Sequence, residues 1–433
     1  MSLPATRTGV SPRSNRLKPL AGLAACLTLL LTACAGNPAG PGSGSAPTSR
    51  TEPAAPRPAP AQVPASPPAA ERPHIEPSRF ESVDGWLQID PRPALAAFVN
   101  SCRRIEARPD HEPMNARAPY AGTAGDWRGA CLQAAMLDGP ELTETSARSF
   151  FERNFTPVRV REQGRLTGYY EPYVEVRSQP DLEFSMAIRA RPGDLLTSDL
   201  GQFIAGLEGQ RIMGRAQDQS FTPYLPRAEI ERENLGVPLA WGRPIDVFFL
   251  QIQGSGRLLF PNGAEARARF SAHNGLDYVS IGRILIARGE LEAHNASKQD
   301  IEAWLRARGP LAWRPLFDEN PRYVFFSLDT DINAQEGPIG SQGAALTPMA
   351  SIAVDPAHHA WGVPIFVEAA IHGEPDWRGL VVAQDAGGAI QGPARGDLFF
   401  GWGHEAGERA GRQNDPGARW TLLLPRHLAR RVR

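Results

Sequence analysis

Short stretches of alternating apolar and polar residues recur along most of the chain, and this spacing constrains the fold more than any other feature. The stretches expected to form strands cover residues 158–161, 166–172, 245–253, 323–326, 351–354, 365–369 and 379–384. Glycine-rich connections separate many of them. Closely spaced short strands favour barrels over a sheet in which strands and helices alternate. We therefore predict a fold that is mainly β with some α.

Helical spacing of apolar residues is less frequent. Residues 91–107 place Leu95, Phe98 and Val99 on one face, which predicts a helix. A second helix is expected to run from Asp126, as its N-cap, to Met136. Two further helices are predicted over residues 280–288 and 297–307.

The first 33 residues have the composition of an export signal. Basic residues precede an apolar run over residues 20–33, which is shorter than the roughly 20 residues needed to cross a bilayer. The run ends in Leu31-Thr32-Ala33-Cys34, which resembles a bacterial lipobox and implies lipidation of Cys34. An ordinary signal peptide with a chance cysteine is the alternative. Because Ala35 and not Asp follows the cysteine, the resemblance implies the periplasmic face of the outer membrane.

Residues 34–73 predict a disordered tether. They consist largely of Pro, Ala, Gly and Ser without apolar periodicity, so they cannot form a core. A partly extended segment of this kind reaches at most ~120 Å. It would let a globular body move well away from the membrane.

Two cysteines remain in the body. Cys26 and Cys34 belong to the signal region, which leaves Cys102 and Cys131 on the two predicted N-terminal helices. In an oxidising periplasm they are candidates for a disulfide, worth about 2 to 4 kcal/mol. Two buried free thiols are the alternative. The chain has no Cys-x-x-Cys, so neither a redox motif nor a zinc knuckle is supported.

Charge and missing motifs exclude several classes of protein. The formal net charge is −1, which leaves no overall field that would attract nucleic acid. Nucleotide-binding glycine motifs, a His-Glu-x-x-His zinc motif and a Gly-x-Ser-x-Gly nucleophile motif are absent, and the nine histidines are scattered. We therefore expect no cofactor and no metal. Carboxylates, amides and aromatic side chains remain, and these are the groups that carbohydrate chemistry uses.

The segment over residues 382–407 holds the densest set of such groups. A strand ends near Asp385, a glycine-rich turn follows, and a second short strand carries Asp397. This arrangement resembles the Asp-rich C-terminal motif of the membrane-bound lytic murein transglycosylase A family, whose aspartates match Asp355, Asp385 and Asp397. Five more stretches support the resemblance in the same order, at residues 168–172, 249–257, 278–283, 320–326 and 337–340. Gln391 departs from the family pattern, where a Lys is expected.

The resemblance implies both a fold and an activity. It implies a double-psi β-barrel formed by residues 74–175 and 327–433, with a second β-rich domain inserted at residues 176–326 and a groove for a glycan strand between them. The implied reaction cleaves the β-1,4 bond between N-acetylmuramic acid and N-acetylglucosamine of peptidoglycan without water and leaves 1,6-anhydro ends, in cell-wall turnover. Cell-wall synthases or amidases are candidate partners, and a monomer is expected.

The resemblance also assigns site residues. Asp397 is the general acid and base, and we expect partial burial and the neighbouring Asp385 to raise its pKa. Asp385 and Asp355 either support catalysis or hold turns. Substrate contacts are expected from Tyr169, Tyr170, Glu171, Gln251, Gln253, Gly254, Ser255, Gln391 and Trp402. For the aromatic residues the alternative is core packing, and for the glutamines it is an amide network inside a barrel.

Two other functions fit the same residues. One is a conventional glycan hydrolase in which Asp385 and Asp397 act as a pair of carboxylates. The other is a non-catalytic lipoprotein that uses its barrel to bind the cell wall.

Overall fold

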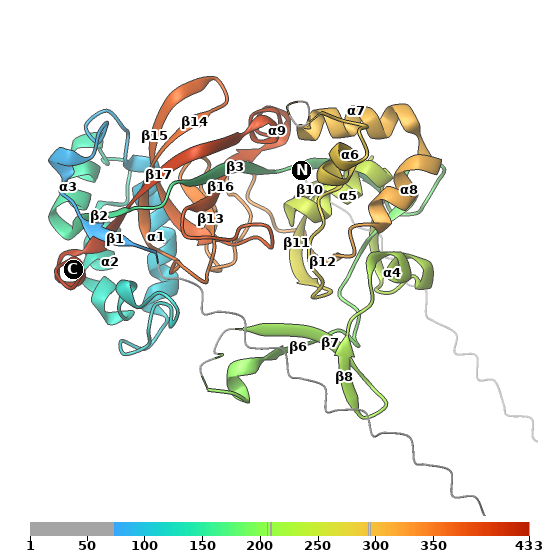
Figure 1. Cartoon of the computed structure of the whole chain (residues 1–433), viewed down its shortest axis with the longest axis horizontal. Coiled ribbons are helices and arrows are strands. Elements are labelled where there is room, and N and C mark those ends of the chain that lie inside the picture. Colours follow the sequence, from blue (N-terminus) through green and yellow to red (C-terminus); the bar gives the residue numbers. More distant parts are fainter. Residues whose placement is uncertain (1–72, 206, 208–209, 293, 295, 433) are drawn as a thin grey trace, which may run out of the picture. The chain divides into compact units, whose positions relative to one another are not determined.

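The computed structural model describes residues 73–432 apart from 206, 208–209, 293 and 295 (Figure 1). The predicted signal peptide, the lipidation site at Cys34 and almost all of the predicted tether lie outside the described residues. The described part of the chain contains no helix with the length and apolar character that crossing a bilayer requires.

The largest sheet closes on itself. Its strands are β1 (Ile75–Pro77), β2 (Phe155–Val160), β3 (Gly164–Glu171), β13 (Ser351–Val354), β14 (Pro364–Ile371), β15 (Glu374–Asp385), β16 (Arg395–Trp402) and β17 (Asn414–Pro425). The strand order is β1-β2-β17-β14-β15-β13-β16-β3, and β3 also pairs with β17, so six strands form a closed barrel. Ile352, Leu398 and Leu422 are fully buried in its core. The barrel confirms the predicted class of fold, whereas the double-psi connectivity stays a prediction.

Three helices cover part of this barrel. They are α1 (Arg92–Glu106), α2 (Gly125–Leu137) and α3 (Glu144–Asn154), and a disulfide between Cys102 and Cys131 joins the first two. The predicted helix over residues 91–107 is confirmed. The predicted N-cap is wrong, because Ala124 holds that position and Asp126 lies in the first turn. The Asp126 carboxylate instead accepts a hydrogen bond from the backbone N–H of Thr123 at 2.8 Å, so it still stabilises the start of the helix.

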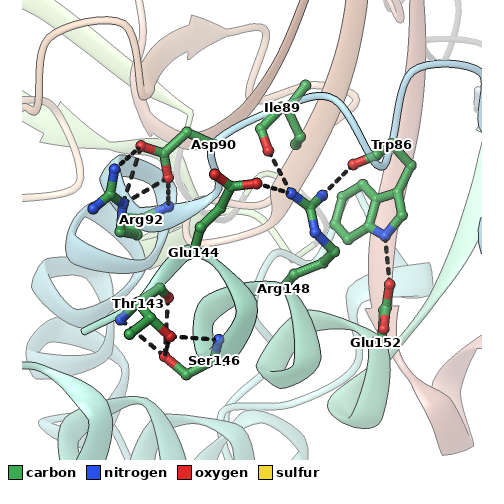
Figure 2. Close-up of polar contacts among 9 residues, drawn as sticks. All are labelled: Trp86, Ile89, Asp90, Arg92, Thr143, Glu144, Ser146, Arg148 and Glu152. Atoms are coloured by element: carbon green, nitrogen blue, oxygen red, sulfur yellow. Dashed lines mark hydrogen bonds and ion pairs between the residues drawn. The ribbon is translucent and has the colours of Figure 1, made fainter. Parts of the chain in front are cut away.

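Helix α3 was not predicted, although its start has a clear signal. Thr143 and Ser146 form a reciprocal capping box, with both hydrogen bonds at 3.1 Å (Figure 2). Arg148 on the same helix donates to the carbonyl oxygen of Ile89 at 2.7 Å, and Trp86 donates its indole N–H to Glu152 at 2.8 Å. These bonds fix α3 against the segment that precedes α1.

A second sheet contains six strands. They are β4 (Tyr173–Arg177), β5 (Met186–Arg189), β9 (Pro238–Gly242), β10 (Gly256–Leu259), β11 (Glu265–His273) and β12 (Val324–Asp329), in the order β12-β11-β10-β4-β9-β5. An isolated bridge between Ala190 and Phe326 links its two ends. Val176, Ile188 and Leu258 form its buried core.

Short helices and a small sheet complete the described part of the chain. The helices are α4 (Arg227–Glu233), α5 (Pro244–Gln253), α6 (Ile281–Ala287), α7 (Lys298–Arg308), α8 (Pro310–Asp318), α9 (Gly403–Arg412) and α10 (Arg426–Ala429), with short 3-10 turns η1 (Phe80–Ser82), η2 (Pro119–Ala121) and η3 (Leu200–Gln202). The small sheet consists of β6 (Leu196–Asp199), β7 (Arg211–Gln217) and β8 (Ser220–Pro223). The helices predicted at 280–288 and 297–307 are confirmed as α6 and α7.

One predicted strand is wrong. Residues 245–253 form helix α5, in which Val247, Leu250 and Gln251 are buried at helical spacing. Pro244 occupies the first turn, where its missing N–H costs nothing, and Gly254 ends the helix with φ +79°. Six of the nine residues are apolar, four of them consecutive at 247–250, and these fit both periods, so only the two ends distinguished a helix from a strand.

Candidate active site

Asp385 and Asp397 lie on the two strands that flank β13 in the barrel. Ala353 on β13 pairs with Asp385 on β15 and also with Asp397 on β16. Neighbouring strands lie about 4.8 Å apart, so the two Cα atoms are separated by roughly 10 Å. Directly paired residues point to the same face of a sheet, which places both carboxylates on one face.

Asp397 lies half-buried next to Thr167. Thr167 is its register partner on β3, and its hydroxyl donates to Asp397 Oδ1 at 2.6 Å. Burial raises the pKa of Asp397 above its ordinary value, and the negative charge of Asp385 adds to this, while Arg395 and Thr167 act in the opposite direction. The direction and both causes agree with the sequence prediction. Within the described residues, Asp397 Oδ2 accepts no hydrogen bond.

Asp385 is held by four donors. Its Oδ1 atom accepts from the backbone N–H and the hydroxyl of Ser341, at 2.9 and 2.7 Å, and from the backbone N–H of Ala386 at 2.9 Å. Its Oδ2 atom accepts from the hydroxyl of Tyr169 at 3.0 Å. These donors favour the charged form, but burial is the larger effect and raises the pKa of Asp385.

Tyr169 donates a hydrogen bond to Asp385 and lies within the electrostatic influence of Asp397. It follows Thr167 by two positions on β3, so both side chains lie on the same face, and its ring lies 5.3 Å from that of Phe399. Burial raises the pKa of its hydroxyl well above the ordinary value, and the charges of Asp385 and Asp397 act in the same direction. The hydroxyl is therefore a neutral donor at the site.

Asp355 has a different position. Its carboxylate accepts hydrogen bonds from the backbone N–H groups of Ala357 at 2.8 Å and Gly392 at 2.7 Å. These bonds hold the turn after β13 and the loop between β15 and β16. The geometry matches the turn-holding alternative, in which Asp355 shapes the loop that precedes Asp397.

The glutamines of α5 do not share one face, because the segment is helical. Gln251 is 4% exposed, and neither atom of its amide has a partner among the described residues. Gln253 accepts a hydrogen bond from the backbone N–H of Tyr170 at 3.2 Å. Gly254 ends the helix, and Ser255 follows it half-buried.

Glu171 is a correction to the predicted substrate contacts. It is fully buried, and its carboxylate accepts from Arg257 Nε at 2.9 Å and from Arg267 Nε at 2.6 Å. Such a side chain offers no surface to a ligand. It links the end of the barrel strand β3 to strands β10 and β11 of the second sheet.

The other three predicted contacts differ in exposure. Tyr170 is buried and belongs to the barrel core. Trp402 is half-buried, and the guanidinium carbon of Arg257 lies 4.6 Å from its ring centroid. Gln391 is exposed and donates to the carbonyl oxygen of Gly388 at 3.3 Å.

Thr167 and Ser341 are site residues that sequence reasoning missed. Thr167 stands two positions before Tyr169 in a predicted strand, and Ser341 directly follows the family stretch at residues 337–340. Their proximity in the sequence to these predicted segments was the only signal that could have pointed to them. Asp397 does not line either of two cavities, of about 670 and 150 Å³, in the described part of the chain. The predicted groove therefore stays a prediction.

Comparisons with known proteins agree with this architecture. Residues 165–327 match the family described as the MltA specific insert domain, and residues 350–423 match the 3D domain. A crystal structure of a membrane-bound lytic murein transglycosylase from Agrobacterium tumefaciens is 33% identical, covers 83% of this chain and 99% of its own, and has a TM-score of 0.73.

Two other relatives extend the comparison. Membrane-bound lytic murein transglycosylase A from Vibrio cholerae is 29% identical over 331 residues, which are 73% of this chain and 76% of the relative. The crystal structure of E. coli MltA with bound chitohexaose, at 24% identity and a TM-score of 0.54 over 76% of this chain and 89% of its own, shows a likeness of fold. With nearly all of the Agrobacterium protein covered at 33% identity, the chain belongs to the membrane-bound lytic murein transglycosylase A family and is a lyase that acts on peptidoglycan.

Proposed function

We propose that Asp397 is the only acid and base of the reaction. Protonated Asp397 donates its proton to the oxygen that joins N-acetylmuramic acid to N-acetylglucosamine, and the β-1,4 bond breaks. The resulting carboxylate accepts the proton of the C6 hydroxyl of the same muramic acid, whose oxygen bonds to C1. The product has a 1,6-anhydro end, no water is consumed, and Asp397 regains its proton. Because the attack is intramolecular, no second catalytic carboxylate is needed.

The hydrogen bonding of Asp385 is the observation that supports this mechanism over hydrolysis. A hydrolase uses a second carboxylate, either as a nucleophile at about 5 Å or as a base for water at about 6.5 to 9.5 Å. Asp385 is the nearest candidate, but four donors occupy its oxygens. A carboxylate held in this way supports the electrostatics of Asp397 and is poorly placed to turn toward C1 or toward a water molecule.

The substrate of this site is a glycan strand. The E. coli relative with bound chitohexaose supports a sugar oligomer as ligand. The strand would lie across the face that carries Asp397 and Tyr169, between a double-psi barrel of residues 74–175 and 327–433 and an inserted domain of residues 176–326. The family match over residues 165–327 supports an insertion of about this extent.

Lipidation of Cys34 would place the enzyme on the periplasmic face of the outer membrane. The lipobox-like residues 31–34 and the membrane-bound relatives support this location. The tether would then allow the body to reach the peptidoglycan from the membrane.

Digestion of purified peptidoglycan sacculi tests the mechanism. The mature chain with Cys34→Ser, which lacks the acyl anchor, should release muropeptides whose ends are identified by mass spectrometry. We expect 1,6-anhydro ends, and the added substitution Asp397→Asn should abolish release while binding to sacculi persists. Reducing ends would instead identify a hydrolase. If the Cys34→Ser chain that keeps Asp397 binds sacculi but releases no muropeptides, the protein is a wall-binding protein.

A further inference from the structure

The small sheet formed by β6, β7 and β8 has one apolar face. In its register Leu196 pairs with Gly214, Ser198 with Ile212, and Phe221 with Ala216. Paired residues share a face, and alternate residues of β7 share it too. This face, called here the apolar sheet face, consists of Leu196, Ser198, Ile212, Gly214, Ala216, Phe221 and Pro223.

The apolar sheet face has no charged residue and is open. Leu196, Ile212 and Phe221 are 42%, 39% and 43% exposed. Gly214 is buried because the ring of Phe221 lies over it, so close that a Cβ atom there would lie 2.7 Å from the ring. No described residue outside the sheet covers this side as part of a hydrophobic cluster.

The opposite face has another character. Met213 packs against the cluster around Tyr224 and Phe325, and a Cβ atom at Gly275 would lie 2.8 Å from the Met213 side chain. The charged residues Arg211 and Arg215 lie on the same face as Met213, where Arg211 is exposed and Arg215 is half-buried. The two faces of the sheet therefore differ in chemistry: the face of Met213 carries charged residues, and the apolar sheet face carries none.

The segment after β6 adds two exposed apolar side chains. Phe203 and Ile204 follow the short turn η3 and are 73% and 54% exposed. The turn begins at Asp199, the end of β6, and Leu200 donates its N–H to the carbonyl of Gln210 just before β7. Five of the large exposed apolar residues therefore belong to this one sheet and its connection: Leu196, Phe203, Ile204, Ile212 and Phe221.

We propose that the apolar sheet face, together with Phe203 and Ile204, docks on the lipid surface of the membrane to which the chain is anchored. The inference rests on the proposed lipidation of Cys34 and is independent of the chemistry of Asp397. After cleavage before Cys34, residues 34–72 would precede the described body, and a tether of at most ~120 Å would keep that body within this distance of the bilayer. A second weak membrane contact adds to an acyl anchor because the anchor raises its effective concentration.

The chemistry of the face distinguishes a bilayer from other occupants. A glycan or a peptide would need hydrogen-bonding groups, and apart from Ser198 the side chains of this face have none. A stable dimer needs roughly 800 Å² from each partner, which is more than a few half-exposed side chains on three short strands supply. Acyl chains require only apolar surface, which phenylalanine and isoleucine at a loop tip provide.

Vesicle flotation tests the proposal. The full mature chain with Cys34→Ser, which lacks the acyl anchor, would be mixed with vesicles of phosphatidylethanolamine and phosphatidylglycerol. We expect measurable partition that Phe203→Ser with Ile204→Ser lowers about tenfold or more. Adding Phe221→Ser should lower it further. Phe203 and Ile204 lie outside the strands, so the double variant should fold and can test the proposal even if the triple variant folds poorly.

Matched controls make the result decisive. Leu182 and Leu311 are 103% and 95% exposed and lie outside this sheet, so Leu182→Ser with Leu311→Ser removes similar apolar surface without affecting partition. All variants should release the same products from isolated sacculi, so a failure of the proposed reaction is seen separately. Absence of vesicle binding by the Cys34→Ser chain, equal loss in the control, or a concentration-dependent dimer abolished by Phe203→Ser would overturn the proposal.

Discussion

The carboxyl group of Asp397 lies among groups that disfavour its charge. Burial and the nearby Asp385 raise its pKa, and the single hydroxyl of Thr167 and the charge of Arg395 only partly compensate. A general acid must be protonated before it acts, so this environment suits the role proposed for it. The same environment also affects stability.

We predict opposite effects of Asp397→Asn on activity and stability. The pKa of Asp397 is higher in the folded chain than in the unfolded chain. Its contribution to the stability of the fold is therefore lost as the pH rises through the folded pKa. Asparagine stays neutral and can still accept from Thr167, so the variant should unfold at a Tm a few degrees higher at pH 7. The difference should vanish below about pH 4. Thermal unfolding across this pH range checks it, and a lower Tm at pH 7 would contradict it.

We predict that the hydroxyl of Thr167 lowers the alkaline limit of activity. It donates to Asp397 at 2.6 Å and so favours the carboxylate. Thr167→Val should raise the pKa of Asp397 further, because a hydrogen bond to a charged group is worth about 1.5 to 3 kcal/mol. Activity falls as the acid loses its proton, so the alkaline limb of the pH profile should move up by about 1 to 2 pH units. Thr167→Ser, which keeps the hydroxyl, should leave the limb in place, and an unchanged limb in Thr167→Val would refute the assignment.

At the scale of elements, the predictions that succeeded depend on local pattern. Strand β13 and the end of β15 were visible as apolar runs, and α1 as a periodic stripe. Helix α5 was missed because its apolar residues are nearly continuous, so period alone could not distinguish a strand from a helix. The aspartates of the site were found from a motif. Thr167 and Ser341 could not be found in the same way, because their contacts depend on strand register and loop closure between distant segments.

The disulfide between α1 and α2 should stabilise these elements more than any single contact in them. Cys102 and Cys131 are 29 residues apart, and closing a loop of this length is expected to stabilise the fold by about 3 to 4 kcal/mol. Replacing both cysteines by Ala should lower the free energy of unfolding by about that amount. Urea denaturation measures it, with the reduced native chain as the control. Equal stability of the oxidised and reduced chains would show that the link contributes nothing.

At the scale of the whole molecule, a buried ionic cluster ties the second sheet to the site. Glu171 ends barrel strand β3 and pairs with Arg257 and Arg267, which lie on β10 and β11. Both arginines also donate to the carbonyl oxygen of Glu336, at 3.0 and 2.6 Å. This carbonyl lies just before residues 337–340, after which Ser341 donates to Asp385. Contacts far from Asp397 therefore fix the segment that holds its neighbour.

We predict that Glu171→Gln lowers the free energy of unfolding by about 3 to 5 kcal/mol, because it leaves two buried guanidinium groups without their counter-charge. Glu175→Gln is the matched control, since Glu175 pairs with Arg243 at 2.9 Å but is 56% exposed, and its loss should cost less than about 1 kcal/mol. At temperatures where both variants are folded, Glu171→Gln should also reduce the rate of muropeptide release, since the segment leading to Ser341 loses its support. Chemical denaturation and sacculus digestion measure the two effects. If Glu171→Gln destabilises the fold no more than Glu175→Gln does, the cluster does not join the sheets. If it destabilises the fold strongly but muropeptide release is unchanged, the cluster does not support the site.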